Sequence, residues 1–390
     1  MSKPTLRILG IRGVPAAHGG FETFAEYLAV HLVARGWRVV VYCQEDGQGK
    51  LFTDTWEGIE RVRIPVGVRG AAGTILFDWL STLHASRSQD LCLTLGYNTA
   101  VFAAVLKLKG APNVINMDGI EWARAKWGTV AKTWFYLNER AGCWLGDHLI
   151  ADHPEIKAHL ATRTRADRIS TIAYGSERID SADSSIVEGL GLVPGNYLTV
   201  IARPEPENSI LEIVDGFSRR SRSLKLVVLG SYSDSNSYHQ KVRAAAGTDV
   251  VFVGAIYERS VVHALRFHSA AYVHGHQVGG TNPSLVEAMG AGNPIIAHDN
   301  RFNRWVAGEG AQYFDGALSF ARIIDQIEAD SAPLATMAQA SLVRFEQCFT
   351  WPKILQDYEE LLSKWIDGGR SDVASGRLEP DIGGRKVDDV

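Results

Sequence analysis

The sequence predicts an α/β protein built from two doubly wound domains, and three observations support this prediction. The 390 residues are about twice the length of a typical domain. In both halves, short apolar runs alternate with longer runs of helical periodicity, which is typical of parallel sheets covered by helices. A polar stretch at 176–196 interrupts the alternation, and we interpret it as the linker between the domains.

The first half is expected to form a domain over residues 1–180. Its first strand, 6–10, leads into a helix over 21–34 whose apolar stripe includes Phe24 and Leu28. Short, mostly apolar runs predict the further strands of this domain at 37–43, 62–66, 91–95, 114–117 and 148–151.

The second half is expected to form a domain over residues 196–350. Its strands are predicted at 197–202, 224–230, 250–254, 271–274 and 294–298. Helices are predicted at 209–219, 238–246, 259–267, 284–290, 320–329, 334–349 and 352–366. The segment 351–366 is expected to pack back toward the N-terminal domain. The tail, 367–390, is rich in glycine and charge and is expected to be disordered.

Composition excludes several classes of protein. With 46% apolar and 22% charged residues, the chain is neither disordered nor fibrous. A formal net charge of -4 argues against a nucleic-acid binder. The four cysteines lack CxxC spacing, which argues against a zinc site or a disulfide framework and favours the cytoplasm. Residues 1–7 do not resemble a signal peptide, and no apolar run reaches the ~18 residues that cross a membrane.

A glycine-rich loop, GIRGVPAAHGGFET, follows the first predicted strand at 10–23. Gly19 and Gly20 let the backbone approach a ligand, and the helix that begins near Gly20 directs its free N–H groups outward. The loop is therefore a candidate contact for a diphosphate or a sugar. It lacks the lysine of a P-loop and the GxGxxG of a dinucleotide fold, so an ordinary turn is the alternative.

A second loop and helix start, HGHQVGGTNPSLVEAM, follows an apolar strand at 274–289. Thr281 and Asn282 suit a helix N-cap, and Pro283 suits the first helical position. The N–H groups around these residues can therefore converge on an anion. Glu287 lies one turn into the helix and is a candidate acceptor for the hydroxyls of a ribose. A capped helix with a solvated glutamate is the alternative.

A third motif, NMDGIEWARAKW at 116–127, places Asp118 at the carboxyl end of a predicted strand. A carboxylate there could position or deprotonate an acceptor hydroxyl, although a helix cap is the alternative. The candidate contacts to a sugar or an acceptor in the three motifs are His18, Glu22, Glu121, His274 and His276. The last two resemble a metal pair, but no third ligand lies nearby, so we expect no metal.

Together with RPEPEN at 203–208 and AHDNRFNRWV at 297–306, these motifs resemble the retaining glycosyltransferases of family 4 over about residues 5–365. The resemblance implies the GT-B fold, in which two Rossmann-like domains face each other across a cleft. The N-terminal half resembles a subgroup associated with bacterial rhamnosyltransferases, whose N-terminal domain is catalogued as a domain of unknown function.

The resemblance implies a role for each motif. Glu287 would hold the nucleotide ribose, Arg203 would neutralise the diphosphate, and Gly19 and Gly20 would approach the diphosphate from the N-terminal domain. Asp118 and Arg203 are the candidate catalytic residues. The remaining candidates for donor binding lie around the start of the second-half helix: Gly279, Gly280, Thr281, Asn282, Pro283, Ser284 and Leu285.

Two positions depart from the wider family. Gly279 stands where the first glutamate of an E-x7-E motif usually contacts the hydroxyls of the donor sugar. Asn208 stands where a lysine usually follows the arginine. Both lie in stretches that resemble the rhamnosyltransferase subgroup, so we interpret the departures as features of that subgroup.

The resemblance implies a sugar transferase that acts with retention. Its expected donor is dTDP-L-rhamnose, and its expected acceptor is a saccharide, on a lipid carrier or on a growing surface polysaccharide or exopolysaccharide. No cofactor is expected, because the nucleotide sugar is a substrate and Arg203 with helix N-termini supplies positive charge without a metal. The base is left open, with residues 255–257 placed to line its pocket. A nucleotide-sugar epimerase and a non-catalytic nucleotide-sugar-binding protein of the same architecture are the alternatives.

The segment 122–144 is rich in aromatic residues with basic residues between them. Such a segment suits the headgroup region of a lipid bilayer, so the cytoplasmic face of the inner membrane is a candidate partner. Alternatively, Trp127, Trp134 and Leu137, which lie at near-helical spacing, are core residues. No nucleic-acid partner is expected.

Overall fold

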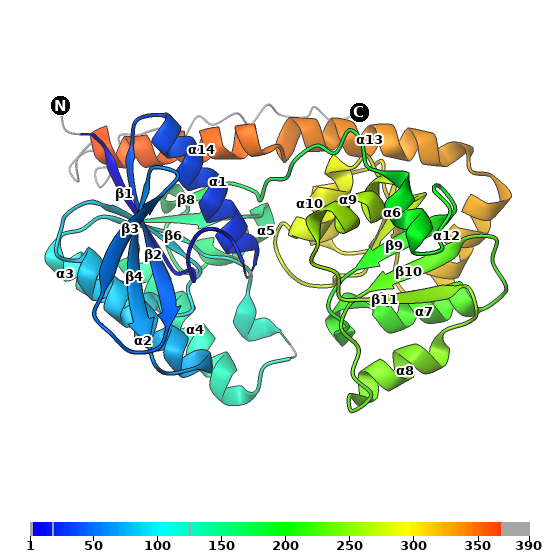
Figure 1. The fold of residues 1–390 in the computed structure, drawn as a ribbon, viewed down its shortest axis with the longest axis horizontal. Helices are drawn as coiled ribbons and strands as arrows, with labels where there is room; N and C mark the ends of the chain where they lie inside the picture. The colour runs from blue at the N-terminus through cyan, green and yellow to red at the C-terminus, as the bar shows by residue number, and fades with distance from the viewer. Residues whose placement is uncertain (1–2, 18, 125, 368–390) are drawn as a thin grey trace. The chain divides into compact units, whose positions relative to one another are not determined.

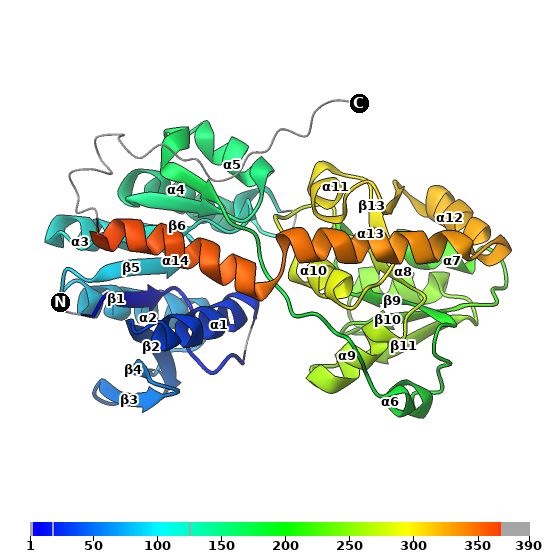
Figure 2. The same cartoon turned by 90° about the horizontal axis from the view of Figure 1, so that it is seen from above.

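The computed structural model describes residues 3–17, 19–124 and 126–367, and it divides into two compact units. The first unit comprises the described residues of Met1–Trp122, Thr129–Ile172 and Leu355–Val390, and the second comprises those of Ala123–Gly128 and Ala173–Ile354. Each unit is a mainly parallel sheet with helices on both faces (Figures 1 and 2). All of the predicted tail except Asp367 lies outside the described residues.

The first unit contains an eight-stranded sheet in the order β3-β4-β2-β1-β5-β6-β7-β8. Its strands are β1 (Thr5–Leu9), β2 (Arg38–Asp46), β3 (Phe52–Trp56), β4 (Ile59–Val66), β5 (Leu91–Leu95), β6 (Asn113–Asn116), β7 (His148–Ala151) and β8 (Ile169–Thr171). Its helices are α1 (Gly20–Ala34), α2 (Gly70–Ala85), α3 (Ala103–Lys109), α4 (Thr129–Leu145) and α5 (Pro154–Ala161), with the 3-10 turns η1 (Ala100–Phe102), η2 (Glu121–Ala123) and η3 (Ala166–Arg168). Strand β3 pairs antiparallel with β4, and the other neighbouring strands pair in parallel.

Helices cover both faces of this first sheet. Figure 1 shows α1 and the C-terminal helix α14 (Trp351–Asp367) on one face and α2, α3 and α4 on the other. The rings of Phe24 on α1 and Tyr358 on α14 lie 4.5 Å apart. The Tyr358 hydroxyl accepts a hydrogen bond of 2.8 Å from the side-chain amide of Asn116, at the end of β6. The end of the described chain therefore packs against the first unit.

The second unit contains a six-stranded parallel sheet in the order β11-β10-β9-β12-β13-β14. Its strands are β9 (Tyr197–Ile201), β10 (Lys225–Leu229), β11 (Val250–Gly254), β12 (Ala271–His274), β13 (Ile295–His298) and β14 (Gln312–Phe314). Its helices are α6 (Ser184–Gly189), α7 (Ile210–Ser218), α8 (Ser237–Ala245), α9 (Arg259–Phe267), α10 (Pro283–Gly290), α11 (Arg301–Ala307), α12 (Ala317–Ala329) and α13 (Ala332–Cys348), with the 3-10 turn η4 (Pro206–Asn208).

Apolar clusters hold the second unit together on both faces of its sheet. On one face, Phe217 of α7, Val242 of α8 and Phe320 of α12 pack against the inner strands. On the other face, Leu285 of α10 packs with Phe345 of α13. Helices on both faces explain why the central strands are almost continuously apolar. The predicted fold class, two doubly wound α/β domains, is confirmed.

The structure adds elements that the sequence analysis did not predict: β3, β8, β14, α6 and α11. Strand β3 is polar and joins β4 through Glu57 and Gly58, whose φ angles of 49° and 77° fit a two-residue hairpin turn. Helix α6 lies inside the predicted linker, where the Asp183 carboxylate accepts a hydrogen bond of 2.9 Å from the N–H of Ser185. Within the described ranges, no helix combines the length and apolarity needed to cross a bilayer.

Candidate functional site

The strand order of each unit reverses at one pair of strands. The chain leaves the centre of the sheet in opposite directions from β1 and β5 in the first unit, and from β9 and β12 in the second. Ligands of open α/β sheets bind outside the carboxyl ends of the strands at such points. The glycine-rich loop follows β1, Arg203 follows β9, and the loop of the second motif follows β12. Topology therefore brings the glycine-rich loop of the first unit, and Arg203 and the 274–289 motif of the second, to the switch points of their sheets.

The loop after β12 is braced by the turn after β9. A Cβ on Gly275 would lie 2.1 Å from the carbonyl oxygen of Asn208, so a larger residue would collide with the backbone there. The N–H of Gln277 donates a hydrogen bond of 2.9 Å to the carbonyl of Glu207. The carbonyl of His276 accepts hydrogen bonds from the side chains of Asn300 and Asn303, at 3.0 and 2.8 Å. The position of this loop is therefore fixed by two neighbouring elements.

Arg203 is an exposed cation at this switch point. Among the described residues, its guanidinium has neither a hydrogen-bond nor an ion-pair partner. Asn208 is buried and donates a hydrogen bond of 2.8 Å to the Arg203 carbonyl. Asn208 therefore shapes the turn that carries Arg203 and adds no charge of its own.

The start of α10 uses some of its N–H groups internally. The side chain of Asn282 caps the helix by accepting a hydrogen bond of 3.0 Å from the N–H of Ser284. The N–H of Leu285 bonds to the carbonyl of Asn282 at 3.1 Å, and Pro283 has no N–H. The N–H groups of Gly279, Gly280 and Asn282 donate no hydrogen bond to any other group in the described part of the chain. Of the N–H groups predicted to converge on an anion, these three are available to bind one.

Glu287 is paired with a buried cation that the sequence analysis did not single out. Its Oε2 lies 2.5 Å from a terminal nitrogen of Arg266 on α9. The side chain of Arg266 is 4% exposed, whereas that of Glu287 is 35% exposed. Arg266 also donates a hydrogen bond of 3.3 Å to Ser284 Oγ, which lies 2.6 Å from the hydroxyl of Tyr272. Arg266 therefore fixes one oxygen of Glu287, while the carboxylate stays accessible to solvent.

His274 and His276 form a stacked pair whose ring centroids lie 4.4 Å apart at an interplanar angle of 10°. His274 is 1% exposed, and neither of its ring nitrogens has a hydrogen-bond partner in the described ranges. Burial lowers the pKa of His274 well below its ordinary value. Burial, together with the charges of Arg124 and Arg203, lowers the pKa of His276 to about 3. Both rings are therefore neutral at physiological pH, and the described residues contain no cluster of three or more ligands for a metal ion.

The glycine-rich loop of the first unit is held by close packing and by Glu22 and Glu26 of α1, which accept hydrogen bonds from its backbone. Gly10 has a φ of +83°, and a Cβ on it would lie 2.2 Å from the carbonyl of Leu95 at the end of β5. Glu22 Oε1 accepts a hydrogen bond of 3.3 Å from the N–H of Arg12, so this candidate sugar contact braces its own loop. Gly19 precedes α1, Gly20 begins it, and His18 lies outside the described residues.

Asp118 follows β6 in a left-handed conformation with φ at 51°. Such a conformation costs about 1–3 kcal/mol for a residue other than glycine, and it often occurs at functional sites. The N–H of Asp118 donates a hydrogen bond of 3.0 Å to Oδ1 of Asn116, whose amide is bound to Tyr358. Nearby, the N–H of Glu121 donates to the hydroxyl of Tyr97 at 2.8 Å. The surrounding structure therefore holds Asp118 in this conformation at the carboxyl edge of the first sheet.

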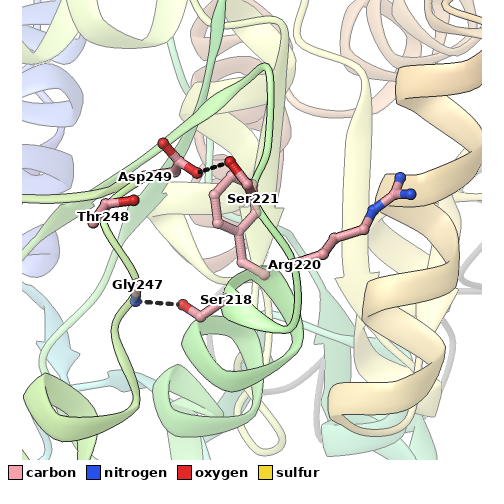
Figure 3. Close-up of a pocket in the computed structure, with 7 residues that line it drawn as sticks. Ser218, Arg220, Ser221, Gly247, Thr248 and Asp249 are labelled. Carbon is pink, nitrogen blue, oxygen red and sulfur yellow. Dashed lines mark hydrogen bonds between the residues drawn. The ribbon is translucent and has the colours of Figure 1, made fainter.

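A small pocket of 120 Å³ lies at the amino ends of β10 and β11 in the second sheet, opposite the carboxyl ends that carry the motifs (Figure 3). Its lining groups bond to one another. The N–H of Gly247 donates to Ser218 Oγ at 2.8 Å, and the Ser221 hydroxyl donates to the Asp249 carboxylate at 3.5 Å. Because ligands of open α/β sheets bind at the carboxyl ends of the strands, this pocket is not part of the candidate site.

Comparison with known proteins agrees with this architecture. Residues 3–177 match the family described as Domain of unknown function (DUF1972). No curated protein matches the chain.

Three solved structures are similar over nearly the whole chain. Sucrose-phosphate synthase from Thermosynechococcus elongatus is 16% identical with a TM-score of 0.80, over 94% of this chain and all of that one. HepE from Anabaena in complex with UDP-glucose is 17% identical with a TM-score of 0.73, over 93% of this chain and all of that one. The UDP-forming α,α-trehalose-phosphate synthase from Burkholderia xenovorans, in complex with glucose-6-phosphate, is 12% identical with a TM-score of 0.69, over the same shares. At these identities the likeness shows the fold, and the chain has the two-domain GT-B fold of these proteins.

Proposed function

We propose that this protein is a glycosyltransferase that moves a sugar from a nucleotide-sugar donor to a saccharide acceptor. The observation that carries the proposal is the grouping at the β9/β12 switch point of an unpaired cation, Arg203, with the free N–H groups of Gly279, Gly280 and Asn282. The similar structures support it, because HepE was solved with UDP-glucose and the trehalose-phosphate synthase is UDP-forming.

The chemistry of sugar transfer requires stabilisation of a departing diphosphate. As the bond between the anomeric carbon and the diphosphate oxygen breaks, negative charge grows on the leaving group and the sugar gains oxocarbenium character. Arg203 is suited to oppose that charge, and the three N–H groups lie at the positive end of the α10 dipole. This arrangement lets the chain's own residues stabilise the leaving group.

Recognition of the nucleotide is proposed to depend on Glu287. Arg266 binds one carboxylate oxygen of Glu287, and the other oxygen has no partner among the described residues. A solvent-accessible carboxylate with one oxygen fixed is well suited to accept hydrogen bonds from the two hydroxyls of a ribose.

The acceptor side of the reaction is proposed to involve Asp118. The carboxylate of Asp118 is half-buried at the carboxyl end of β6. It is a candidate to position the attacking hydroxyl and to accept its proton as the new glycosidic bond forms. Glu121, in the turn that follows, is a candidate contact to the acceptor.

The finer identity of the reaction rests on the resemblance of the motifs to bacterial rhamnosyltransferases. On that basis we propose dTDP-L-rhamnose as donor, retention at the anomeric carbon, and an acceptor saccharide of surface polysaccharide or exopolysaccharide synthesis. Gly279 has no carboxylate with which to bind donor hydroxyls, which fits a donor sugar other than the glucose of the UDP-glucose bound by HepE.

Calorimetric titration with a panel of nucleotide sugars tests the donor assignment. We expect nucleoside diphosphate sugars to bind and dTDP-L-rhamnose to bind most tightly, with loss of affinity in Arg203→Ala. Arg322→Ala is the matched control, because Arg322 is also exposed and unpaired among the described residues of the second unit. Equal affinity in both variants would contradict the role of Arg203.

A further inference from the structure

Helix α4 in the first unit turns an apolar stripe toward solvent. Its members are Val130, Trp134, Leu137 and Trp144, which are 86%, 37%, 58% and 66% exposed. Their spacing of three, four or seven residues places them on one side of the helix. The alternative interpretation of Trp134 and Leu137 as core residues is therefore wrong.

The opposite side of α4 faces inward and carries a buried carboxylate with partners. Glu139 is 1% exposed, and its carboxylate lies 2.6 Å from Arg163 Nε and 3.1 Å from His159 Nε2. Trp122 Nε1 donates a further hydrogen bond of 2.8 Å to it. Rotating the helix to bury the apolar stripe would expose this network and break it, which is costly for a buried charge. The network therefore holds the apolar stripe at the surface.

The apolar surface continues onto η1 and α3, where Val101 and Leu108 are 43% and 87% exposed. The N–H of Val101 donates to Asn138 Oδ1 on α4 at 3.0 Å, and Lys107 Nζ donates to the carbonyl of Trp144 at 3.1 Å. Contacts at both ends thus keep η1 and α3 beside α4, and Figure 1 shows α3 and α4 on the same face of the sheet. We call the six exposed apolar residues on η1, α3 and α4 the α3–α4 face.

The exposed and half-exposed charges on α2, η1, α3 and α4 are of one sign. Among the Asp, Glu, Lys and Arg residues of α2, η1, α3 and α4, the two acids, Asp78 and Glu139, are buried. The remaining four, which are exposed or half-exposed, are all basic: Lys107, Lys109, Lys132 and Arg140. This excess is local, because the whole chain has 44 acidic and 40 basic residues. A partner of this surface is therefore expected to be both apolar and anionic.

We propose that the α3–α4 face docks this protein on the surface of a lipid bilayer that contains anionic lipids. Exposed tryptophans suit the headgroup boundary, apolar side chains enter the region below it, and lysines meet lipid phosphates. A second polypeptide would need acids of matching arrangement, whereas an anionic bilayer supplies negative charge to any arrangement of lysines. The docking is peripheral and salt-sensitive. A lipid-linked acceptor would be reached from such a position, but the docking does not depend on sugar transfer.

Vesicle sedimentation with the full chain tests this proposal without donor or acceptor. One set of vesicles contains phosphatidylcholine alone, and the other contains equal amounts of phosphatidylcholine and phosphatidylglycerol. We expect the protein to sediment with the anionic vesicles at low salt, to stay in solution with the neutral ones, and to be released at high salt. Replacement of Lys109, which is exposed next to Leu108 on α3, by glutamate should weaken the partition by about fivefold or more.

Apolar variants test the other half of the proposal. Leu108→Glu and Leu137→Glu should abolish sedimentation, whereas Leu318→Glu, on α12 of the second unit and 59% exposed, is the matched control and should not. Unchanged melting temperatures would establish that the variants are folded. Recovery of the wild type in solution with both vesicle types would overturn the proposal. Sedimentation velocity tests the alternative that the face binds a second copy of the chain. If the wild type self-associates and Leu108→Glu abolishes the association, the proposal is also overturned. Sugar transfer to a water-soluble acceptor would be unaffected by either result, so the two proposals can fail separately.

Discussion

Replacing Glu287 by alanine should weaken donor binding and also destabilise the second unit. The variant leaves the guanidinium of Arg266, which is 4% exposed, without its carboxylate. Loss of a partner in a buried ion pair costs about 3–5 kcal/mol. Because Glu287 itself is 35% exposed and the site is partly hydrated, we expect the lower cost of a hydrogen bond to a charged group, about 1.5–3 kcal/mol.

The reverse change should cost less. Arg266→Met keeps the apolar stem of the side chain and leaves the charge on Glu287, which is accessible to water. The double variant Arg266→Met with Glu287→Ala should be more stable than Glu287→Ala alone, because it leaves no buried charge unpaired. Glu188→Ala, an exposed glutamate on α6 without a recorded side-chain partner among the described residues, is the control and should have no effect.

Differential scanning calorimetry measures these changes as shifts of the unfolding transition. For a domain of this size, each kcal/mol lowers the melting temperature by about 2–4 °C, so Glu287→Ala should lower it by about 3–12 °C. Titration calorimetry should show about tenfold to 150-fold weaker donor binding for the same variant, if one charge-assisted hydrogen bond to the ribose is lost. Strictly additive stability losses in the double variant would refute the pairing of Arg266 with Glu287. Unchanged donor affinity in Glu287→Ala would refute the ribose assignment.

Three further predictions concern the same unit. Arg203→Ala should lower kcat more than it raises the donor KM, because the diphosphate gains charge in the transition state, and an unaltered kcat would remove Arg203 from the mechanism. Activity should survive EDTA, since Arg203 and the N–H groups before α10 supply positive charge, and loss on chelation with rescue by magnesium or manganese would contradict this expectation. Because the folded-state pKa of His274 lies well below its unfolded value, stability should fall as the pH drops below the unfolded pKa of ~6.5, by up to about 1.4 kcal/mol per pH unit. His274→Phe, which keeps the stacked ring and removes two unpaired nitrogens, should reduce this pH dependence in urea unfolding, and an undiminished slope would show that other groups cause it.

Much of the fold is predictable from the sequence because buried parallel strands are short apolar runs. The runs at 37–43 and 91–95 fall on β2 and β5. Gly10, directly after β1, is required because the backbone there approaches the carbonyl of Leu95. Strand β3 escaped prediction because it lies at an edge, where polar side chains are allowed. Its turn at Glu57 and Gly58 was the available signal.

The candidate site was predictable in its loops but not in their supports. Motifs such as the one at 274–289 mark where the backbone bends at a sheet edge, and this is local information. Arg266 lies on another helix and meets Glu287 only through the packing of α9 and α10 around β12. Likewise, the sequence shows that Asn208 carries no charge, but it does not show that the Asn208 side chain donates a hydrogen bond to the Arg203 carbonyl.

Helix α4 illustrates the limit of periodicity. The stripe through Val130, Trp134 and Leu137 has the spacing of a core-facing surface, yet it is exposed. The deciding interaction is the burial of Glu139 with Arg163 and His159, two residues of later segments that no local pattern connects to α4. A long-range buried network therefore determined which side of this helix faces inward.

The most direct test of sugar transfer is the release of nucleoside diphosphate from dTDP-L-rhamnose in the presence and absence of a saccharide acceptor. The proposed function predicts a release that depends on the acceptor, persists in Arg322→Ala and is lost in Arg203→Ala. Release of an isomerised nucleotide sugar without any acceptor would instead identify an epimerase. Donor binding with no turnover on any acceptor would identify a nucleotide-sugar-binding protein, and either result would contradict the proposal.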